Sequence, residues 1–181
     1  MLPFPVGNWA ELIGNPFIRE QCYNVDKQAA LAAENIPHFN QGQHAAFDEI
    51  IKAVDEQSGQ TFFLHGPGGT RKTFTYTILC YHFCSKGKIV LCVALSGIAV
   101  LLLIGGRTAH SCFKIPLKIH KNSMCPISKN DELADLLHIT DLIIWDEAPM
   151  QYCHIHECVN RTFQDIRGND KLFGGICGCF W

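Results

Sequence analysis

The chain has 181 residues, 10 cysteines and a formal net charge of −2. This length gives room for one domain with a sizeable core, or for part of a larger one, and the charge excludes a strongly basic nucleic-acid binder but not a local basic groove. The cysteines are scattered, and residues 1–17 lack a basic segment followed by an unbroken apolar core. We therefore expect no secretory signal, and reduced thiols in an intracellular protein.

The chain begins with a lead segment, residues 1–38, of mixed polarity and with scattered prolines. We assign it no function, although residues 25–35 can form a helix. Residues 39–57 have apolar side chains at helical spacing, with Asn40 as the expected N-cap. Gln43 lies in the first turn of this helix, where its amide can bind an adenine edge, but a surface glutamine is the commoner explanation.

The segment TFFLHGPGGTRKT, residues 61–73, predicts a buried strand, a glycine-rich turn and a helix that continues to about Ser85. This is the layout of a P-loop, in which glycines let backbone N–H groups surround a phosphate at a helix N-terminus. Lys72 is expected to reach the outer phosphates, and the Thr73 hydroxyl to ligate Mg²⁺. A glycine-rich turn without a nucleotide is the alternative. The predicted nucleotide-binding residues of this segment are Gly66, Pro67, Gly68, Gly69, Thr70, Arg71, Lys72 and Thr73.

Arg71 departs from the pattern G-x-x-x-x-G-K-[ST], which has glycine at this position. If the position needs a positive φ, a residue other than glycine costs roughly 1–2 kcal/mol. The guanidinium group could instead contact phosphate, provided that it has room to swing outward. We interpret the segment as a P-loop by descent whose competence depends on this residue.

Residues 89–104 form the longest apolar run, which is shorter than the roughly 18–20 residues of a membrane span and is interrupted at Ser96. We predict a buried parallel strand over residues 89–95, followed by a helix that Ser96 caps and that ends at glycines 105–106. The next segment, GGRTAHSCFKIP, combines hydrogen-bond donors with Phe113, as a single-strand-binding edge does. An ordinary polar loop with Phe113 in the core explains it equally well.

Residues 117–130 are expected to form a loop and residues 131–138 a short helix. The run DLIIWDE, residues 141–147, predicts a buried strand that ends in two acids. Because ligands bind at the carboxyl ends of parallel strands, Asp146 is expected to hold Mg²⁺ and Glu147 to polarise the attacking water.

Residues 150–166 predict a helix that ends before Gly168. Its sequence CHIHEC, with two cysteines near the end of the chain, raises the alternative of a zinc site. Because the spacing matches no common zinc motif, we favour polar helix positions with unrelated cysteines.

Together these segments resemble the first motor domain of the Pif family of superfamily-one DNA helicases. The resemblance covers about residues 39–175 and is carried by FFLHGPGGTRKT, SGIAVLLLIGGRTAHSCFKIP, LIIWDEAPM, and NRTFQDI with FGG. It implies an α/β, RecA-like P-loop NTPase domain with a mainly parallel sheet, and ATP with Mg²⁺ as cofactors. It also implies 5′-to-3′ unwinding of single-stranded and tailed duplex DNA in DNA repair, recombination and telomere maintenance, in a nuclear protein with no membrane partner. The helicase of rolling-circle transposons is a related source.

The resemblance also implies roles for individual residues. It assigns Gln43 to adenine, the P-loop residues to the phosphates and Mg²⁺, and Asp146 with Glu147 to Mg²⁺ and water activation. Lys72, Asp146 and Glu147 are thus the predicted catalytic residues. The residues in its single-strand DNA-contacting segments are Ser96, Gly97, Thr108, His110 and Phe113.

The chain departs from the family pattern at Arg71, at Asn160, where the family usually has aspartate, and after Gly175. We therefore expect residues 39–181 to be a partial motor domain, incomplete at its C-terminal end and without the second motor domain. The missing strand lies between the P-loop strand and the Asp-Glu strand, and residues 176–180 could fill part of that slot. If they do not, unpaired edges would make the chain marginally stable. The alternative to a helicase is a silent remnant, or a single-strand DNA-binding fragment of a transposon-type helicase.

Overall fold

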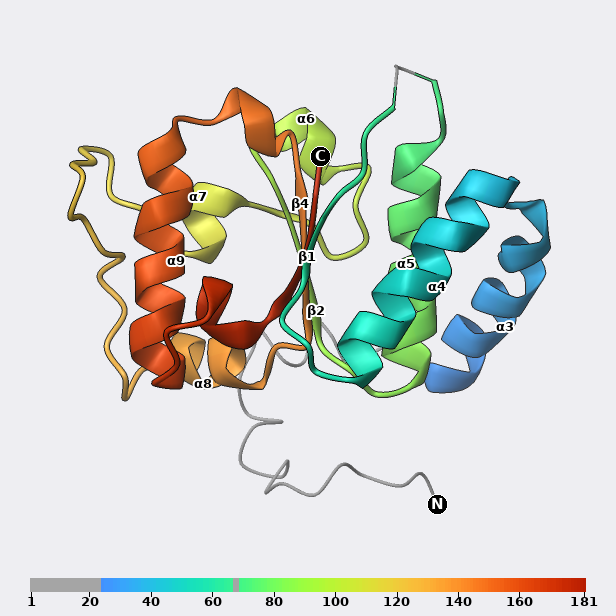
Figure 1. The fold of residues 1–181 in the computed structure, drawn as a ribbon, viewed down its shortest axis with the longest axis horizontal. Coiled ribbons are helices and arrows are strands. Elements are labelled where there is room, and N and C mark those ends of the chain that lie inside the picture. Colours follow the sequence, from blue (N-terminus) through green and yellow to red (C-terminus); the bar gives the residue numbers. More distant parts are fainter. Residues whose placement is uncertain (1–23, 67–68) are drawn as a thin grey trace.

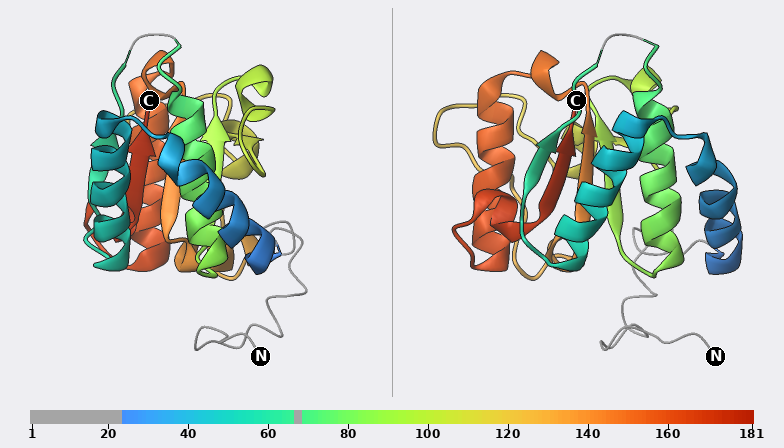
Figure 2. Two further views of the ribbon diagram at one scale, coloured as in Figure 1. Left: turned by 90° about the vertical axis from the view of Figure 1, so that its right-hand side faces the viewer. Right: turned by 45° about the vertical axis from the view of Figure 1, so that its right-hand side comes forward.

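A computed structural model describes residues 24–66 and 69–181 of the chain. They form an α/β domain in which a five-stranded parallel sheet lies between two layers of helices (Figures 1 and 2). The strands follow the order β1-β5-β4-β2-β3. Their bounds are β1 Thr61–Phe63, β2 Val90–Ala94, β3 Arg107–Thr108, β4 Leu142–Asp146 and β5 Cys177–Phe180. The predicted fold class is therefore confirmed.

The helices divide between the two faces of the sheet (Figure 1). The α helices are α3 Val25–Asn35, α4 Gln41–Asp55, α5 Lys72–Ser85, α6 Gly97–Val100, α7 Ala109–Cys112, α8 Glu132–Ile139 and α9 Cys153–Arg167. The 3-10 helices are η1 Ile36–His38, η2 Ala148–Met150 and η3 Leu172–Gly175. Helices α4 and α5 share one apolar cluster with the sheet, α7, α8 and α9 share the other, and α3 packs on α5. No helix within the described ranges is long and apolar enough to cross a membrane.

The two central strands explain the division of the core. Every residue of β2 and β4 is buried, and successive side chains point to opposite faces of the sheet. Ile144 of β4 therefore belongs to the cluster with α4 and α5, whereas Ile143 and Trp145 belong to the cluster with α9. The sheet thus has helices on both sides, as its near-continuous apolar strands predict.

The slot between the P-loop strand and the Asp-Glu strand is filled by β5. It pairs in parallel with β1 on one side and with β4 on the other, so that Phe180 lies opposite both Phe63 and Trp145. The possibility that residues 176–180 fill the slot is confirmed for residues 177–180. Gly178 lies within this strand, where glycine is usually unfavourable, but a Cβ there would approach the Phe180 ring to 2.4 Å, so the glycine makes room for that ring. The unpaired edges that would have flanked an empty slot do not arise.

Several predicted caps and boundaries are confirmed. Asn40 caps α4 in a reciprocal capping box with Gln43, Ser96 caps α6, and Gly168 ends α9 in the left-handed conformation. The helices predicted over residues 25–35 and 72–85 have those bounds.

Three predicted segments differ from the structure. The strand predicted to be buried over residues 61–65 ends at Phe63 and is largely exposed. It lies at the edge of the sheet that the described residues form, with β5 as its neighbour on one side. The helix predicted to reach Ile104 ends at Val100, after which the chain forms turns with bonds from residue i+3 to residue i. Helix α9 starts three residues later than predicted, at Cys153, because a 3-10 turn follows β4.

Candidate nucleotide and DNA site

The predicted catalytic residues lie at one end of the sheet, where the carboxyl ends of the parallel strands meet. The P-loop connects the end of β1 to α5, Asp146 and Glu147 end β4, and Ser96 follows β2. The C-terminus of the chain lies at the same end (Figures 1 and 2). In parallel α/β sheets this end is where ligands bind.

Lys72 is held against the P-loop. Its Nζ donates to the carbonyl oxygen of Gly66 at 2.6 Å and to the hydroxyl oxygen of Thr70 at 3.2 Å. Gly69 has a φ of +83°, which glycine adopts without strain. Lys72 and Thr73 form the first turn of α5, so an anion at this end would meet the positive end of the helix dipole. Pro67 and Gly68 lie outside the described residues.

Arg71 adopts the left-handed conformation, with φ +57° and ψ +35°. The position therefore needs a positive φ, so a residue other than glycine is strained there. Arg71 is exposed and precedes α5 without a side-chain capping bond, and its guanidinium carbon lies 5.7 Å from the centre of the Phe74 ring. The guanidinium group thus lies over an aromatic side chain of α5, as in a cation–π contact.

Gln43 connects α4 to the P-loop. Its Oε1 accepts from the backbone N–H of Asn40 at 3.0 Å, and its Nε2 lies 3.4 Å from the carbonyl oxygens of Thr70 and Arg71. The structure thus places this glutamine beside the loop, as the resemblance implies. Its role towards adenine remains a prediction.

Asp146 is the last residue of β4, and Glu147 follows it in a turn. Asp146 is only 2% exposed, and its Oδ1 accepts from the backbone N–H of Glu147 at 3.0 Å. Burial raises the pKa of Asp146 above its ordinary value, whereas the Glu147 N–H bond and the Lys72 charge act in the opposite direction. Lys72 is therefore within electrostatic reach of Asp146, as expected if the two share one site.

Glu147 has a φ of +57°, in the left-handed region that a non-glycine residue rarely adopts. Its Oε2 accepts from the backbone N–H of Ser96 at 3.0 Å. This bond ties the end of β4 to the end of β2 and fixes the direction of the carboxylate.

Two residues at this end were not predicted from the sequence. The hydroxyl of Tyr76 is fully buried without a hydrogen-bond partner among the described residues, and burial is the main cause that raises its pKa, with smaller contributions from Cys179 and Asp146. Tyr76 follows Lys72 by four residues on α5, so helical spacing would have placed both side chains on one face.

Trp181 is the second such residue. Its backbone N–H donates to the Trp145 carbonyl at 3.1 Å, its carbonyl accepts from the Ala148 N–H at 2.6 Å, and its ring centre lies 4.1 Å from Lys72 Nζ. No spacing in the sequence indicates this contact.

These residues fit a magnesium nucleotide in their chemistry. Lys72 and the α5 N-terminus supply the positive groups that phosphates need, and the Thr73 hydroxyl and the Asp146 carboxylate are oxygen ligands of the kind that Mg²⁺ prefers. Glu147 lies beside them with a fixed carboxylate. Arg71 stands where the P-loop pattern has glycine, and the Trp181 ring contacts Lys72 from outside the pattern.

Comparison with known proteins agrees with this arrangement. The family model for PIF1-like helicases matches residues 38–180. The chain belongs to the PIF1-like helicase family. An ATP-dependent DNA helicase Pif1 from Psychrobacter sp. (strain PRwf-1) is 31% identical over 122 residues, which are 66% of this chain and 18% of that protein.

Solved Pif1 structures have the same fold. The Pif1 helicase of Candida albicans matches with a TM-score of 0.65 and 25% identity over 78% of this chain and 32% of its own. The Bacteroides Pif1 helicase, in complex with ADP-AlF3 and single-stranded DNA, matches with a TM-score of 0.62 and 26% identity over 75% of this chain and 31% of its own. The chain thus spans about a third of the solved relatives.

The predicted DNA-contacting residues of this PIF1-like chain lie in three places. Ser96 and Gly97 begin α6, next to Glu147, and Thr108 and His110 lie where β3 meets α7. Phe113 is only 1% exposed and packs with Trp145 and Phe163. Its ring has no free face for a base, so the core interpretation of Phe113 holds and the stacking interpretation does not.

The α9 segment does not form the metal site considered above. His154 Nδ1 lies 2.7 Å from Glu157 Oε2, whereas Cys158 is buried with its Sγ 3.7 Å from that of Cys125. No group of three histidine, cysteine or acidic side chains within the described residues could hold a metal ion. The cysteines in this part of the chain are free thiols.

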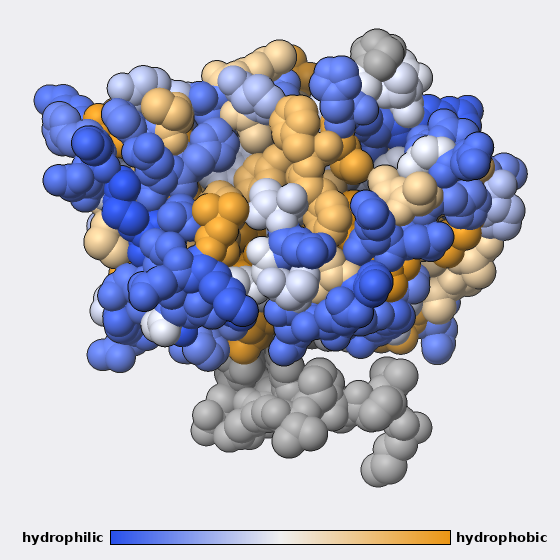
Figure 3. Space-filling model, viewed as in Figure 1, coloured by the Kyte–Doolittle hydropathy of each residue, from blue (hydrophilic) through white to orange (hydrophobic). Residues whose placement is uncertain are grey.

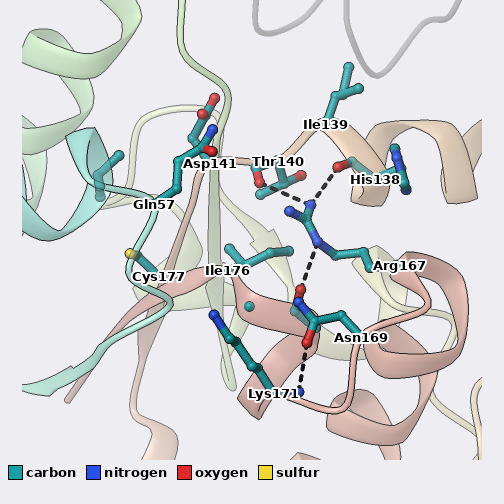
Figure 4. Close-up of a pocket in the computed structure, with 13 residues that line it drawn as sticks. Gln57, His138, Ile139, Thr140, Asp141, Arg167, Asn169, Lys171, Ile176 and Cys177 are labelled. Carbon is teal, nitrogen blue, oxygen red and sulfur yellow. Dashed lines mark hydrogen bonds between the residues drawn. The ribbon is translucent and has the colours of Figure 1, made fainter.

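A separate pocket of about 290 Å³ lies at the opposite, amino ends of β4 and β5 (Figure 4). Arg167 crosses it: Nε donates to the Gly174 carbonyl at 2.9 Å, and Nη1 donates to the carbonyls of His138 and Thr140. Arg167 thereby satisfies carbonyl groups at the C-terminal end of α8. The pocket is therefore distinct from the nucleotide site, and its arginine has a structural role.

Proposed function

We propose that this chain is the ATP-binding part of an ATP-dependent DNA helicase that couples ATP hydrolysis to 5′-to-3′ unwinding. The convergence of Lys72 with Asp146 and Glu147 at one end of the sheet carries this proposal. Family membership supports a helicase, and the complex of the Bacteroides Pif1 helicase with ADP-AlF3 and single-stranded DNA supports nucleotide and DNA as ligands.

In this proposal each residue has one task. The backbone N–H groups of Gly69 to Thr73 and the Lys72 ammonium group bind phosphate, and the Gln43 amide binds adenine. The Thr73 hydroxyl and the Asp146 carboxylate hold Mg²⁺. When bound, magnesium-ATP supplies the γ-phosphoryl group and the free energy of its hydrolysis. The Glu147 carboxylate, oriented by the Ser96 N–H, accepts a proton from the attacking water.

The DNA ligand in this proposal is single-stranded or tailed duplex DNA. Ser96, Gly97, Thr108 and His110 are the residues that we assign to it, and Phe113 is omitted because it is buried. The position of Ser96 supports this assignment, because its backbone contacts Glu147 and could transmit the presence of DNA to the water-activating carboxylate. We propose roles in DNA repair, recombination and telomere maintenance, in the nucleus.

A catalytically silent remnant that still binds single-stranded DNA is the second candidate. The left-handed Arg71 and the contact of the Trp181 ring with Lys72 favour it, because both change the surroundings of the phosphate-binding groups. The two candidates differ in a single measurable property, which is hydrolysis of ATP.

The test is a titration of the chain with a fluorescent ATP analogue in the presence of Mg²⁺, followed by an assay of phosphate release with and without single-stranded DNA. We expect binding that Lys72→Ala weakens at least about tenfold, since it removes a charged contact to phosphate. Lys52→Ala, an exposed change on α4, is the matched control and should leave binding unchanged. Binding without phosphate release would favour the silent remnant, and equal binding by Lys72→Ala would contradict both the site and the proposal.

A further inference from the structure

Trp181 is fixed in place by backbone bonds to β4 and to the 3-10 helix η2 that follows it. Its N–H and carbonyl groups bond to Trp145 and Ala148, the residues on either side of Asp146 and Glu147. The backbone of Trp181 therefore extends β5 along the end of β4. A residue held by two backbone bonds cannot be moved away without breaking that extension of the sheet.

The alternation of side chains along this strand determines where the Trp181 ring lies. Phe180 packs with Trp145 and Phe173, on the α9 side of the sheet. Trp181 follows it and packs against the cluster on the opposite side, which contains α5. Lys72 begins α5, so the ring is directed at the end of the helix that binds phosphate.

The ring then covers the Lys72 ammonium group. Nζ lies 4.1 Å from the ring centre, which is within the range of a cation–π contact, while Gly66 and Thr70 accept its N–H groups. In a P-loop this lysine reaches the β- and γ-phosphates. An outer phosphate that approached Lys72 would therefore have to compete with the aromatic ring.

We propose that Trp181 is a specificity-determining residue of the nucleotide site, which reduces the preference for nucleoside triphosphates over diphosphates. The α- and β-phosphates can be bound by the loop N–H groups and the α5 N-terminus, whereas the Trp181 ring lies over the Lys72 ammonium group. The γ-phosphate relies most on Lys72, which the ring covers. This inference rests on the proposed function, because it assumes that the site binds a magnesium nucleotide.

The test compares the dissociation constants of fluorescent ADP and ATP analogues for the wild-type chain and for Trp181→Ala, with Mg²⁺ present. We expect the ratio of the ADP constant to the ATP constant to rise about tenfold in the variant, because the Lys72 ammonium group no longer has to leave the aromatic ring to contact the γ-phosphate. Trp181→Leu retains apolar packing but lacks a π face, so it should behave like Trp181→Ala and replaces it if that variant does not fold. Tyr152→Ala, which removes an exposed aromatic ring after β4, is the matched control and should leave the ratio unchanged.

A second readout needs no nucleotide. We expect the rate at which an acylating reagent modifies Lys72, followed by peptide mass spectrometry, to rise severalfold in Trp181→Ala and Trp181→Leu. Lys114, paired with Asp131 at 2.6 Å, serves as the internal reference. An unchanged Lys72 rate together with an unchanged nucleotide ratio would overturn the proposal. If no variant binds either nucleotide but the Lys72 rate rises, the proposed function fails while the contact of Trp181 with Lys72 stands.

Discussion

Arg71 and Glu147 have the same unusual backbone angle, φ +57°, on the two sides of the candidate nucleotide site. Hydrogen bonds stabilise the strained conformation of Glu147: its N–H donates to Asp146, and its carboxylate accepts from the N–H of Ser96. The strand that precedes it, β4, is buried between β5 and β2. Around Arg71 there is no capping bond, and the side chain is exposed.

This difference separates two kinds of backbone strain. Strain persists where surrounding contacts over-determine a conformation, and such positions tend to be functional. The Glu147 side has these contacts, and the carboxylate that they orient is the predicted water-activating group. On the Arg71 side the side chain adds strain without a capping bond, and its exposed guanidinium group lies over the Phe74 ring.

Replacing Trp145 by alanine should have the largest effect, because it removes the core side chain that supports the Asp146–Glu147 turn. Trp145 is fully buried and contacts Phe113 and Phe180, so we expect a loss of about 3–5 kcal/mol of unfolding free energy, measured by urea denaturation. Phe63→Ala on the opposite side of the site is the control. Phe63 is 56% exposed on the edge strand β1, so its replacement should cost far less unfolding free energy. Apolar residues gather in the middle of the face shown in Figure 3, which is the part of the view where β1 runs in Figure 1. Equal losses would show that the two sides are equally supported.

Arg71→Gly should stabilise the chain by about 1 kcal/mol, because the relief of left-handed strain exceeds the backbone entropy that glycine loses. In a chain of this size that corresponds to a rise in Tm of roughly 2–4 °C, measured by thermal denaturation. The same change should improve binding of the fluorescent ATP analogue. Glu147→Gly relieves the same backbone strain but loses the bond to Ser96, so its Tm should rise by less than that of Arg71→Gly. An equal gain from both variants would contradict the distinction between supported and unsupported strain.

Gln43→Ala should cost up to about 1 kcal/mol of unfolding free energy, because it removes half of the capping box of α4. It also removes the amide contacts to the P-loop, so nucleotide affinity should fall more than stability does. Gln41→Ala, at an exposed position of the same turn, is the control for both measurements. A fall in stability without a fall in nucleotide affinity would separate Gln43 from the site.

The smallest expected effect is the pH dependence of Asp146→Asn. Burial raises the folded-state pKa of Asp146, so the folded chain binds more protons than the unfolded chain, and stability falls as pH rises from the unfolded pKa through the folded pKa. The asparagine variant should therefore have a higher Tm than the wild type at neutral pH, and the difference should shrink towards pH 4.

Asp131→Asn should show the opposite sign. Lys114 is the main cause that lowers the pKa of Asp131, so this carboxylate contributes stability above its unfolded pKa, and that contribution is lost as pH falls through the folded pKa. The variant should have a slightly lower Tm at neutral pH, because the pair is partly exposed. The same change of Tm with pH in both variants would contradict the causes that we assign to the two pKa shifts.

Much of the fold could be predicted because its signals are local. The turn from β1 into α5, the caps at Asn40 and Ser96 and the glycine end of α9 depend on side chains within one or two helical turns. The apolar runs of β2 and β4 likewise indicate strands that are covered on both faces. The sequence alone therefore determined the order and type of these elements, and the residues to be examined for nucleotide binding.

The tertiary structure alone decided which distant segments meet. The place of β5 depends on pairing with β1, where Gly178 lies opposite Thr61, and with β4, where Cys177 lies opposite Leu142. Four residues with a glycine among them carry little local signal for either pairing. The burial of Phe113 depends on α9, and the contact of Trp181 with Lys72 depends on the same β5 pairing. Hydrophobic burial is non-directional, so an apolar side chain indicates that it will be covered but not by which segment.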